Sequence, residues 1–417
     1  MNIIGILSIT ITSIFFLIIL SYYILLFKKD TFSKHAPSKQ FNSITVIIPA
    51  HNEQKYIAEC LNSVLKAKFN GKKEIIVVND GSADNTGKIL KKFESKIKLI
   101  NIKHSGKSTA INTALRQAKG KLIAIVDADS IISIDSLNEA KKYFSDPKVG
   151  AVTSVIKVKN DSATMSSWIR LEQLYNSLLR QLFCKINVNI VTPGPLSIYR
   201  KDVLENLGGF GVKGLSEDVD IAVRIIKSGR KIAFSKNSVA ETNMPENWKG
   251  FSKQRSRFAK GWINIFKRHL KMDKHLLQIY TLPIALFGYF QAVIMGLITL
   301  YNIISGYIAY FYSQGIIFNL GVAKFLFEWF SIFGTLSWAY RTIMNPLNAS
   351  MFDWIGILAS LLIYPLYIIA ISRYDKFTWK KTLALIFMFP FWLIIMVFYV
   401  FNIKELFVKK QKNIWTK

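Results

Sequence analysis

Two aspartates stand directly after an apolar run, where the segment KLIAIV leads into Asp127-Ala-Asp129. Two neighbouring carboxylates at the end of a buried strand resist ionisation unless a positive group joins them. A divalent cation meets that need, and ligands that offer only oxygen favour Mg²⁺ or Mn²⁺, which can also bridge a diphosphate. A helix cap needs one Asp, whereas two in this place predict a cation site.

Polar turns follow three other apolar runs. They hold His51, Asn52 and Glu53 in the first, Asp80 in the second, and His104 and Lys107 in the third. Each turn alone is an ordinary connection between a strand and a helix. Open α/β sheets bind ligands at the carboxyl ends of their strands, so these turns and Asp127-Ala-Asp129 together predict one site at one edge of a sheet.

Further along the chain, the segment GLSEDVDI places Glu217, Asp218 and Asp220 around the start of a helix expected to run to about residue 227. Acids in a first helical turn complement the helix dipole, and that structural role can explain any one of them. Glu217-Asp218 after a glycine-containing loop also suits a general base that deprotonates an alcohol. Both interpretations remain open at this point.

The segment after Trp248 combines basic and aromatic side chains. Gln254, Arg255 and Arg257 begin it. A guanidinium can clamp a leaving diphosphate, and an aromatic face can stack on a sugar ring. This segment therefore supplies groups that complement the acidic residues described above.

Between about residues 40 and 272, β-rich runs alternate with amphipathic stretches. These runs and stretches are the elements that must position the residues described above. This rhythm predicts one α/β domain built from βα units around a mostly parallel sheet. The expected strands are 44–49, 74–78, 97–102, 121–126 and 149–158, and the expected helices are 54–67, 84–94 and 107–118.

Residues 1–27 are expected to form an uncleaved membrane anchor. Residues 2–27 carry no charge, and a helix of about 20 apolar residues crosses a bilayer. Lys28 and Lys29 follow directly, so the positive-inside rule places the N-terminus outside and the α/β domain in the cytoplasm.

Residues 276–403 are expected to form a second membrane region of about four helices, at 281–312, 316–340, 354–372 and 382–403. The segment 316–340 contains Lys324 and Glu328, which suits an interfacial helix as well as a spanning one. The basic tail 404–417 predicts a cytoplasmic C-terminus. Four crossings, however, place the basic segment 373–381 outside, against the same rule.

Two amphipathic segments, 164–185 and 248–270, are expected to dock the domain on the bilayer as interface helices. For the first of them, packing on the core of the domain is the alternative, because apolar residues at three- and four-residue spacing occur in both cases.

The composition excludes several classes of protein. Of the 417 residues 51% are hydrophobic and 19% are charged, which rules out a disordered chain. Lys and Arg number 55 against 26 Asp and Glu, a formal charge of +29. Nucleic acid is not the expected partner, since no recognition fold accompanies the charge, and anionic membrane lipid explains it better. Cys60 and Cys184 cannot build a disulfide framework.

Taken in order, the motifs resemble those of glycosyltransferase family 2, in particular its processive, membrane-embedded polysaccharide synthases. They are VIIPAHNE, VVNDGSADNT, GKSTAINTAL, VDADS, TPGPLSIYRKDVLENLGGF, LSEDVDIAVRI and QRSRF, within about residues 44–270. The resemblance implies a GT-A fold, a Rossmann-like domain that binds a nucleotide-diphosphosugar, here a UDP-sugar used with Mg²⁺ or Mn²⁺.

The resemblance also implies a role for each matching residue. Asn52 or Glu53 and Asp80 would contact the uridine, Lys107 the nucleotide-sugar, and Asp127 and Asp129 the metal and diphosphate, with Asp129 as the main ligand. Asp218 matches the catalytic base of the (T/S)ED motif, beside Glu217. Gln254, Arg257 and Phe258 match the QxxRW motif, which holds the diphosphate and the acceptor end of the glycan.

Phe258 stands where the family has Trp, so the stacking face is kept and the indole N–H is lost. Trp262, one helical turn later, either compensates or packs in the membrane interface. The resemblance implies an inverting enzyme that extends a β-linked glycan and passes it through the membrane helices. The alternative is a single transfer to a lipid acceptor such as a polyprenyl phosphate. A binding module without activity is disfavoured, because Asp127-Ala-Asp129, Asp218 and the residues from Gln254 to Arg257 are all present.

Overall fold

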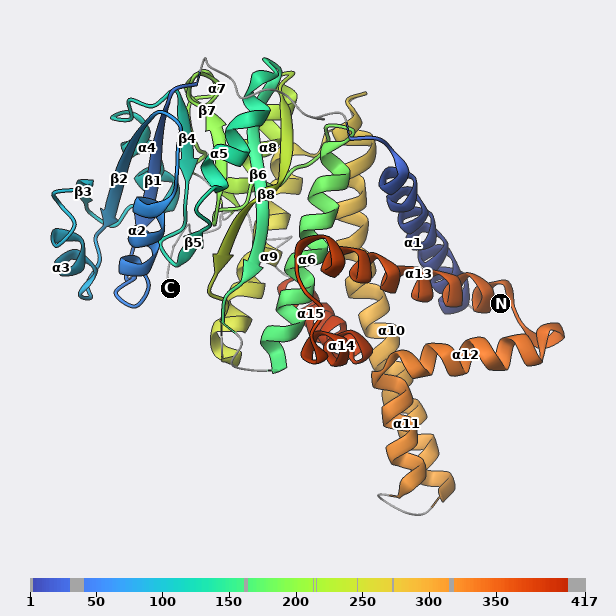
Figure 1. Ribbon diagram of the computed structural model, residues 1–417. Helices are drawn as coiled ribbons and strands as arrows, with labels where there is room; N and C mark the ends of the chain where they lie inside the picture. The colour runs from blue at the N-terminus through green and yellow to red at the C-terminus, as the bar shows by residue number, and fades with distance from the viewer. Residues whose placement is uncertain are drawn as a thin grey trace.

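In the computed structural model, an α/β domain adjoins a group of long apolar helices (Figure 1). The structure describes residues 3–30, 41–160, 164–212, 214, 216–245, 247–271, 274–314 and 319–403. The basic tail expected at 404–417 lies outside these residues.

The domain is built on an eight-stranded sheet with the order β3-β2-β1-β4-β7-β6-β8-β5. The strands are β1 (Ser43–Ala50), β2 (Lys72–Asp80), β3 (Lys98–Ile102), β4 (Leu122–Ile125), β5 (Ser130–Ile132), β6 (Val149–Val158), β7 (Ser197–Arg200) and β8 (Lys231–Thr242). The half formed by β3, β2, β1 and β4 is parallel, as expected. In the other half β7 runs antiparallel to β4 and β6, and β5 runs antiparallel to β8, so the sheet is mixed.

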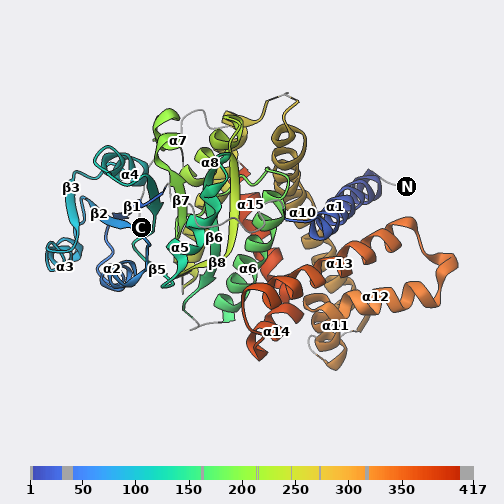
Figure 2. The ribbon, with the colours of Figure 1, turned by 45° about the horizontal axis from the view of Figure 1, so that its top comes forward.

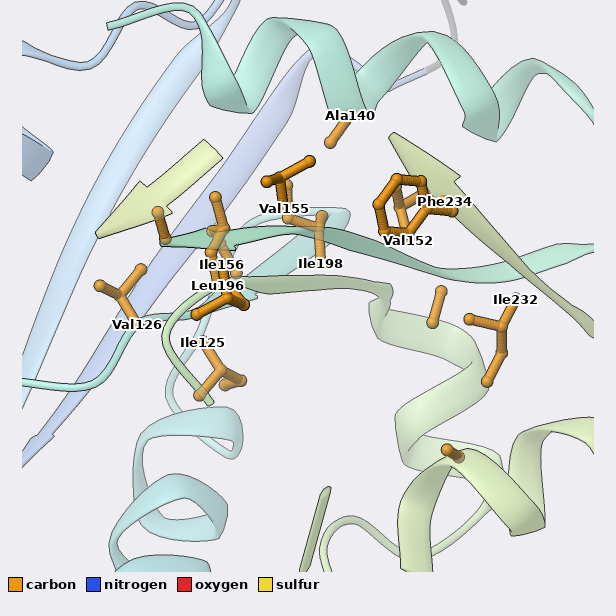
Figure 3. Close-up of a cluster of buried hydrophobic side chains, with 14 of the residues drawn as sticks. Ile125, Val126, Ala140, Val152, Val155, Ile156, Leu196, Ile198, Ile232 and Phe234 are labelled. Atoms are coloured by element: carbon orange, nitrogen blue, oxygen red, sulfur yellow. The ribbon is translucent and has the colours of Figure 1, made fainter. Parts of the chain in front are cut away.

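The central strands are buried along nearly their whole length, which is typical of a sheet covered on both faces. Figure 3 shows side chains of this core from β4, β6, β7 and β8, together with Ala140 of a covering helix. Branched residues such as Ile125, Val152 and Ile198 dominate it, because they pack well on a pleated surface. This packing fixes the strand ends that carry the polar turns.

Helices connect the strands and cover the sheet. They are α2 (Ile57–Lys66), α3 (Thr86–Lys91), α4 (Lys107–Leu115), α5 (Ser136–Lys141), the 3₁₀ turn η1 (Lys142–Ser145), α6 (Thr164–Cys184), α7 (Lys201–Asn206), α8 (Glu217–Lys227) and α9 (Trp248–His269). The expected helices at 54–67, 84–94 and 107–118 correspond to α2, α3 and α4. The structure adds β5, β7, β8, α5 and α7, which are too short or too irregular in pattern to predict from periodicity.

The apolar helices are α1 (Ile3–Phe27), the π turn η2 (Leu277–Thr281), α10 (Leu282–Gln314), α11 (Leu320–Phe330), α12 (Ile332–Met344), the 3₁₀ turn η3 (Pro346–Asn348), α13 (Met351–Tyr374), α14 (Trp379–Ile386) and α15 (Met388–Asn402). Among the described residues three helices are long and apolar enough to cross a membrane, at Gly5–Phe27, Leu277–Ser313 and Met351–Tyr374. The number rises to five if each of two bent pairs counts as one span.

Those bent pairs replace two of the straight helices expected from the sequence. The segment expected at 316–340 bends by 95° between α11 and α12, and the one expected at 382–403 bends by 62° between α14 and α15. Ser331 is extended at the first break. Pro390 lies in the first turn of α15, where a missing backbone N–H leaves no hydrogen bond unmade, and its ring prevents α14 from continuing.

The two amphipathic helices lie between the sheet and the apolar helices. One side of α6 packs on β6 and β8, and other parts of it contact α1, α13 and α14 (Figures 1 and 2). In the same way α9 contacts α8 and α15. Both therefore attach the domain to the apolar region, and α6 also covers the core of the domain.

Candidate active site

The polar turns after β1, β2 and β3 lie side by side, because these strands are parallel neighbours. Asp80 is fully buried, and its carboxylate accepts hydrogen bonds from the backbone N–H groups of Ser105 and Gly106 at 2.7 and 2.9 Å. The imidazole Nδ1 of His51 lies 2.7 Å from the Asp80 carbonyl oxygen. Asp80 thus ties the second turn to the other two.

Asn52 and Glu53 also connect turns. Asn52 adopts a left-handed conformation with φ of 55°, which Asn tolerates better than most residues, and its Oδ1 accepts a hydrogen bond from Ala83 N–H at 2.9 Å. Glu53 is buried, and its backbone N–H donates to Thr86 Oγ1 at 2.7 Å. These residues shape the end of the sheet at which the uridine is expected.

His51, Asp80 and His104 bring potential ligand atoms within 4.8 Å of one another. The two imidazole rings stack, however, with centroids 4.1 Å apart and planes inclined by 24°. An imidazole lone pair lies in the plane of its ring, so one ion does not suit two stacked rings. The Asp80 carboxylate is also held by two backbone N–H groups. The arrangement is better explained as packing between the turns.

Lys107 begins α4 and links two acidic parts of the site. Its Nζ lies 2.7 Å from Asp127 Oδ1 and 3.0 Å from Glu217 Oε1, and all three side chains are at most 25% exposed. Burial alone would lower the pKa of Lys107, but the two carboxylates raise it well above its ordinary value. The ammonium is therefore held in its charged form between residues that are distant in the sequence.

Asp129 is the less compensated member of the Asp127-Ala-Asp129 pair. Its Oδ1 accepts hydrogen bonds from Ser130 Oγ at 3.2 Å and Thr242 Oγ1 at 3.4 Å. Burial and, second, the charge of Asp127 raise the pKa of Asp129 to about 6. A divalent cation would relieve this repulsion, and carboxylate oxygens are the ligands that Mg²⁺ and Mn²⁺ prefer. The residues present therefore fit a divalent cation.

The first turn of α8 holds Glu217, Asp218 and Asp220. Burial and, second, the charge of Glu217 raise the pKa of Asp218 to about 6. Burial also acts to raise the pKa of Glu217, but the Lys107 ammonium outweighs it and lowers that pKa below its ordinary value. The two adjacent carboxyls thus differ. Glu217 is paired with Lys107, whereas the pKa of Asp218 is raised toward neutrality, which suits a general base.

Asp220 takes no part in this pair. Its carboxylate accepts hydrogen bonds from Arg224 and from Arg268, each at 2.9 Å. His269 Nε2 lies 2.8 Å from the same carboxylate. Arg224 further donates to the carbonyl oxygens of Leu207 and Gly209. Asp220 is therefore a structural link between α8, α9 and the loop before α8.

On α9 the expected residues separate into two groups. The positive charge of Arg257 acts to lower the pKa of both Glu217 and Asp218, although burial outweighs it at Asp218, so its guanidinium lies within electrostatic range of the acidic site. Phe258 is 38% exposed, and the Arg257 guanidinium lies 5.7 Å from its ring centroid. Gln254 Nε2 contacts Met244 Sδ at 3.6 Å. Trp262 instead stacks on Phe266 with centroids 5.7 Å apart, inside an apolar cluster.

Two features of the site were not expected from the sequence. Thr192 and Gly194 form hydrogen bonds with the backbone of Asp218 and Asp127. Arg255, beside Arg257, forms a two-pronged ion pair with Glu172 of α6 at 2.6 and 2.5 Å. The two prolines of Thr192–Ser197 indicate a rigid segment, but its partners lie far away in the sequence and no local pattern reveals them.

Comparison with known proteins agrees with the chemistry of this site. The family model of Glycosyl transferase family 2 matches residues 45–208. The chain is 30% identical over 295 residues to the probable glycosyltransferase YdaM of Bacillus subtilis, which covers 64% of this chain and 69% of that protein. It is 28% identical over 235 residues to the poly-beta-1,6-N-acetyl-D-glucosamine synthase of Staphylococcus aureus, which covers 55% of this chain and 57% of that protein.

Among solved structures, the mannosyltransferase PcManGT from Pyrobaculum calidifontis, in complex with GDP-Man and Mn²⁺, has a similar fold. The TM-score is 0.62 at 21% identity, and the match covers 98% of this chain and 100% of the other. The GT-A fold expected from the sequence is therefore confirmed.

Proposed function

The chain belongs to glycosyl transferase family 2, and on that premise we propose that it transfers a hexosyl or N-acetylhexosaminyl group from a UDP-sugar to an acceptor at the membrane. It is a glycosyltransferase with the GT-A fold, flanked by helices apolar enough to span a bilayer. One observation supports the proposal above all. The Lys107 ammonium contacts both Asp127 and Glu217, and the pKa of Asp218, the residue after Glu217, is raised to about 6.

The donor side of the reaction is assigned to the ends of the parallel strands. Asn52 or Glu53 and Asp80 would lie at the uridine, and Lys107 at the diphosphate. Asp129, with Asp127, would hold a divalent cation, either Mg²⁺ or Mn²⁺; when bound, such a cation stabilises negative charge on the leaving diphosphate. The Mn²⁺ in the PcManGT structure supports the expectation of a metal.

The acceptor side is assigned to α8 and α9. Asp218 takes the proton from the acceptor hydroxyl, whose oxygen forms a bond to the anomeric carbon of the donor sugar while the bond from that carbon to the diphosphate oxygen breaks. The configuration at that carbon is thereby inverted. Arg257 and Gln254 would hold the departing diphosphate, and Phe258 would stack on the acceptor.

We propose that the product is a β-linked polysaccharide, extended at the cytoplasmic face and carried across the membrane. The similarity to the polysaccharide synthase of S. aureus supports this, although the matched region spans only 57% of that protein. A single transfer to a polyprenyl-phosphate or other lipid acceptor is the second candidate. Phe258 favours it, because the QxxRW motif of the polymerising members has Trp there.

The donor and product can be identified together. Purified full-length protein in detergent or lipid is incubated with a panel of UDP-sugars and with GDP-mannose, in Mg²⁺ or Mn²⁺, and release of the nucleotide is measured. We expect release with a UDP-sugar and no release after chelation of the metal. Long polymer supports the first candidate, one sugar on lipid supports the second, and no release with any donor contradicts the proposal.

The role of Asp218 is tested by Asp218→Asn. We expect the turnover number to fall by at least about a thousandfold while UDP binding changes little, because the base acts on the acceptor and not on the nucleotide. Asp202→Asn is the matched control, since Asp202 is exposed in the first turn of α7. Normal turnover of Asp218→Asn would remove this residue from the mechanism.

A further inference from the structure

A short segment between α6 and β7, Thr192-Pro193-Gly194, crosses from one acidic half of the site to the other. At one end the Thr192 hydroxyl donates a hydrogen bond to the main-chain oxygen of Asp218 at 2.7 Å, and the Thr192 N–H faces the same oxygen at 3.4 Å. At the other end the Asp127 N–H donates to the carbonyl oxygen of Gly194 at 3.1 Å. The segment is thus bonded to both the expected base and the strand-end aspartate.

Gly194 has no side chain, and the space beside it is occupied by the ion pair of Lys107 and Asp127. A β-carbon added at residue 194 would overlap the Asp127 carboxylate and would lie 2.6 Å from Lys107 Nζ. The backbone of Gly194 has an ordinary negative φ, so glycine is needed here for room and not for conformation. Any larger residue must displace the ammonium or the carboxylate.

The segment itself is rigid. Pro193 and Pro195 on either side of Gly194 each have a fixed φ. The Ser197 hydroxyl donates to the Pro193 carbonyl oxygen at 2.8 Å, and Ser197 pairs with Ile125 in the sheet. Because Ile125 precedes Asp127 on the same chain segment, the position of Thr192 is fixed relative to the end of β4.

We propose that Thr192-Pro193-Gly194 is a brace that sets the position of the Asp218 carboxyl relative to Asp127 and Lys107. Thr192 and Gly194 are then positioning residues, which act on the reaction through Asp218 and Lys107. The inference rests on the proposed glycosyl transfer, in which Asp218 and Lys107 act on opposite sides of the bond that breaks. It explains why two prolines enclose a glycine at this place.

The first test removes the bond to α8. Thr192→Val keeps the shape and loses the hydroxyl, and Thr192→Ser keeps the hydroxyl. Because a displacement of about 1 Å can reduce a rate by about a hundredfold, we expect Thr192→Val to lower kcat by about ten- to a hundredfold with the donor KM within about twofold. Thr192→Ser should recover at least about half of the original kcat.

The second test acts on the other end of the brace. Gly194→Ala should weaken UDP binding, measured by calorimetry in Mn²⁺, by at least about tenfold, because the β-carbon displaces Lys107 or Asp127. Thr192→Val should leave UDP binding unchanged. A role in folding alone would give neither this separation of kcat from binding nor the rescue by serine.

Matched controls and a measure of folding complete the experiment. Thr113→Val removes a hydroxyl that bonds within its own helix, and Gly288→Ala adds a β-carbon with nothing within 4 Å. Both should behave like the original protein, and the unfolding temperatures of all variants should agree within about 3 °C. The brace is refuted if Thr192→Val keeps normal kcat or if Thr192→Ser is equally impaired. If Asp218→Asn itself turns over normally, the assignment of Asp218 as the base is at fault instead, and if the original protein releases no nucleotide from any donor, the proposed function is.

Discussion

The carboxyl of Asp218 is destabilising when it is ionised in the folded protein. Burial and, second, Glu217 raise its pKa from an ordinary 3.8 to about 6. A carboxyl with a raised pKa in the folded state contributes stability that is fully present below its ordinary pKa and is lost as the pH rises through about 6. The residue best suited to be the base is therefore held there at the expense of stability.

This leads to a prediction for Asp218→Asn that is independent of activity. At about pH 7.5 the amide carries no charge, so we expect the variant to unfold a few degrees, about 2 to 4 °C, above the original protein. The difference should narrow as the pH falls to about 5, because Asp218 then becomes protonated in the original protein. Thermal unfolding at both pH values measures this. An unchanged or lower unfolding temperature at about pH 7.5 would contradict it.

At the residue scale, the sequence is informative where chemistry follows a strand. Lys107, Asp127 and the turn residues lie together as expected, because carboxyl ends of parallel strands meet at one edge. The contact of Lys107 with Glu217 could not be predicted, since no local spacing links residues so far apart in the chain. Trp262 could not be placed either, because periodicity does not distinguish packing from binding.

At the scale of elements, α6 and α9 are joined by the ion pair of Arg255 and Glu172. Arg255 is 7% exposed and Glu172 is 20% exposed. The Arg255 guanidinium also lies 4.8 Å from the ring centroid of Phe251 and 5.6 Å from that of Phe391. Because Arg257 is on the same helix, this pair also orients the residues assigned to the diphosphate.

Breaking the pair should therefore destabilise the protein strongly. Arg255→Met leaves Glu172 charged and partly buried without its partner, and we expect a loss of about 3 kcal/mol in the free energy of unfolding. The double variant Arg255→Met with Glu172→Met should recover most of that loss, since two apolar side chains replace a desolvated pair. Denaturant unfolding in detergent measures both. If the double variant is no more stable than the single one, the pair does not act as a unit.

The prediction of elements was most reliable for long and regular patterns. The strand expected at 149–158 is β6, with the same bounds. For α6 the apolar periodicity indicated a buried face but not its partner, and the helix contacts both the sheet and the apolar helices. The break before α15 had a visible signal in Pro390, whereas no proline marks the break at Ser331.

Part of the positive charge of the chain lies far from the apolar helices. The strand β3 is at the edge of the sheet, and β3 and α3 lie at the end of the domain away from the apolar helices (Figures 1 and 2). Both elements and the turns beside them carry exposed lysines, such as Lys91, Lys98 and Lys103. Lysines on an edge strand discourage pairing with another chain, so this part of the +29 charge is explained without lipid.

For the whole molecule, contacts with the domain define one side of the apolar region. Lys185 Nζ donates to the carbonyl oxygens of Leu25 and Leu26 at the end of α1. Thr281, just before α10, donates to Val188 O at 3.0 Å. At the end of α13, Tyr374 OH donates to Gln181 Oε1 of α6 at 2.5 Å. Thus α1, α10 and α13 each have one end against the domain.

The bent pair α14 and α15 contacts the domain beside its break and at the end of α15. The Trp168 indole N–H donates to Ala384 O of α14 at 3.0 Å, and the Asn402 amide at the end of α15 lies 3.3 Å from Ser256 Oγ of α9. The segment between α13 and α14 is also held, since Lys157 of β6 lies 3.6 Å from Asp375. This arrangement favours three crossings, by α1, α10 and α13, over one crossing followed by four. It also places the basic segment 373–381 on the same side of the membrane as the α/β domain, and the positive-inside rule predicts that such a segment faces the cytoplasm.

Labelling of single cysteines distinguishes the two arrangements. Three crossings put Leu347, which is 99% exposed, outside the cell and Phe377, which is 51% exposed, inside, whereas four C-terminal crossings reverse both positions. The native Cys60 and Cys184 are buried and should react little. In intact cells a membrane-impermeant maleimide should therefore label Leu347→Cys and not Phe377→Cys, which should react only after the cells are permeabilised. The reverse pattern would restore the four crossings, and protection of both residues would show that α10 and α13 do not span the membrane. Because each variant is the control for the other, poor access of the reagent to one loop cannot imitate either topology.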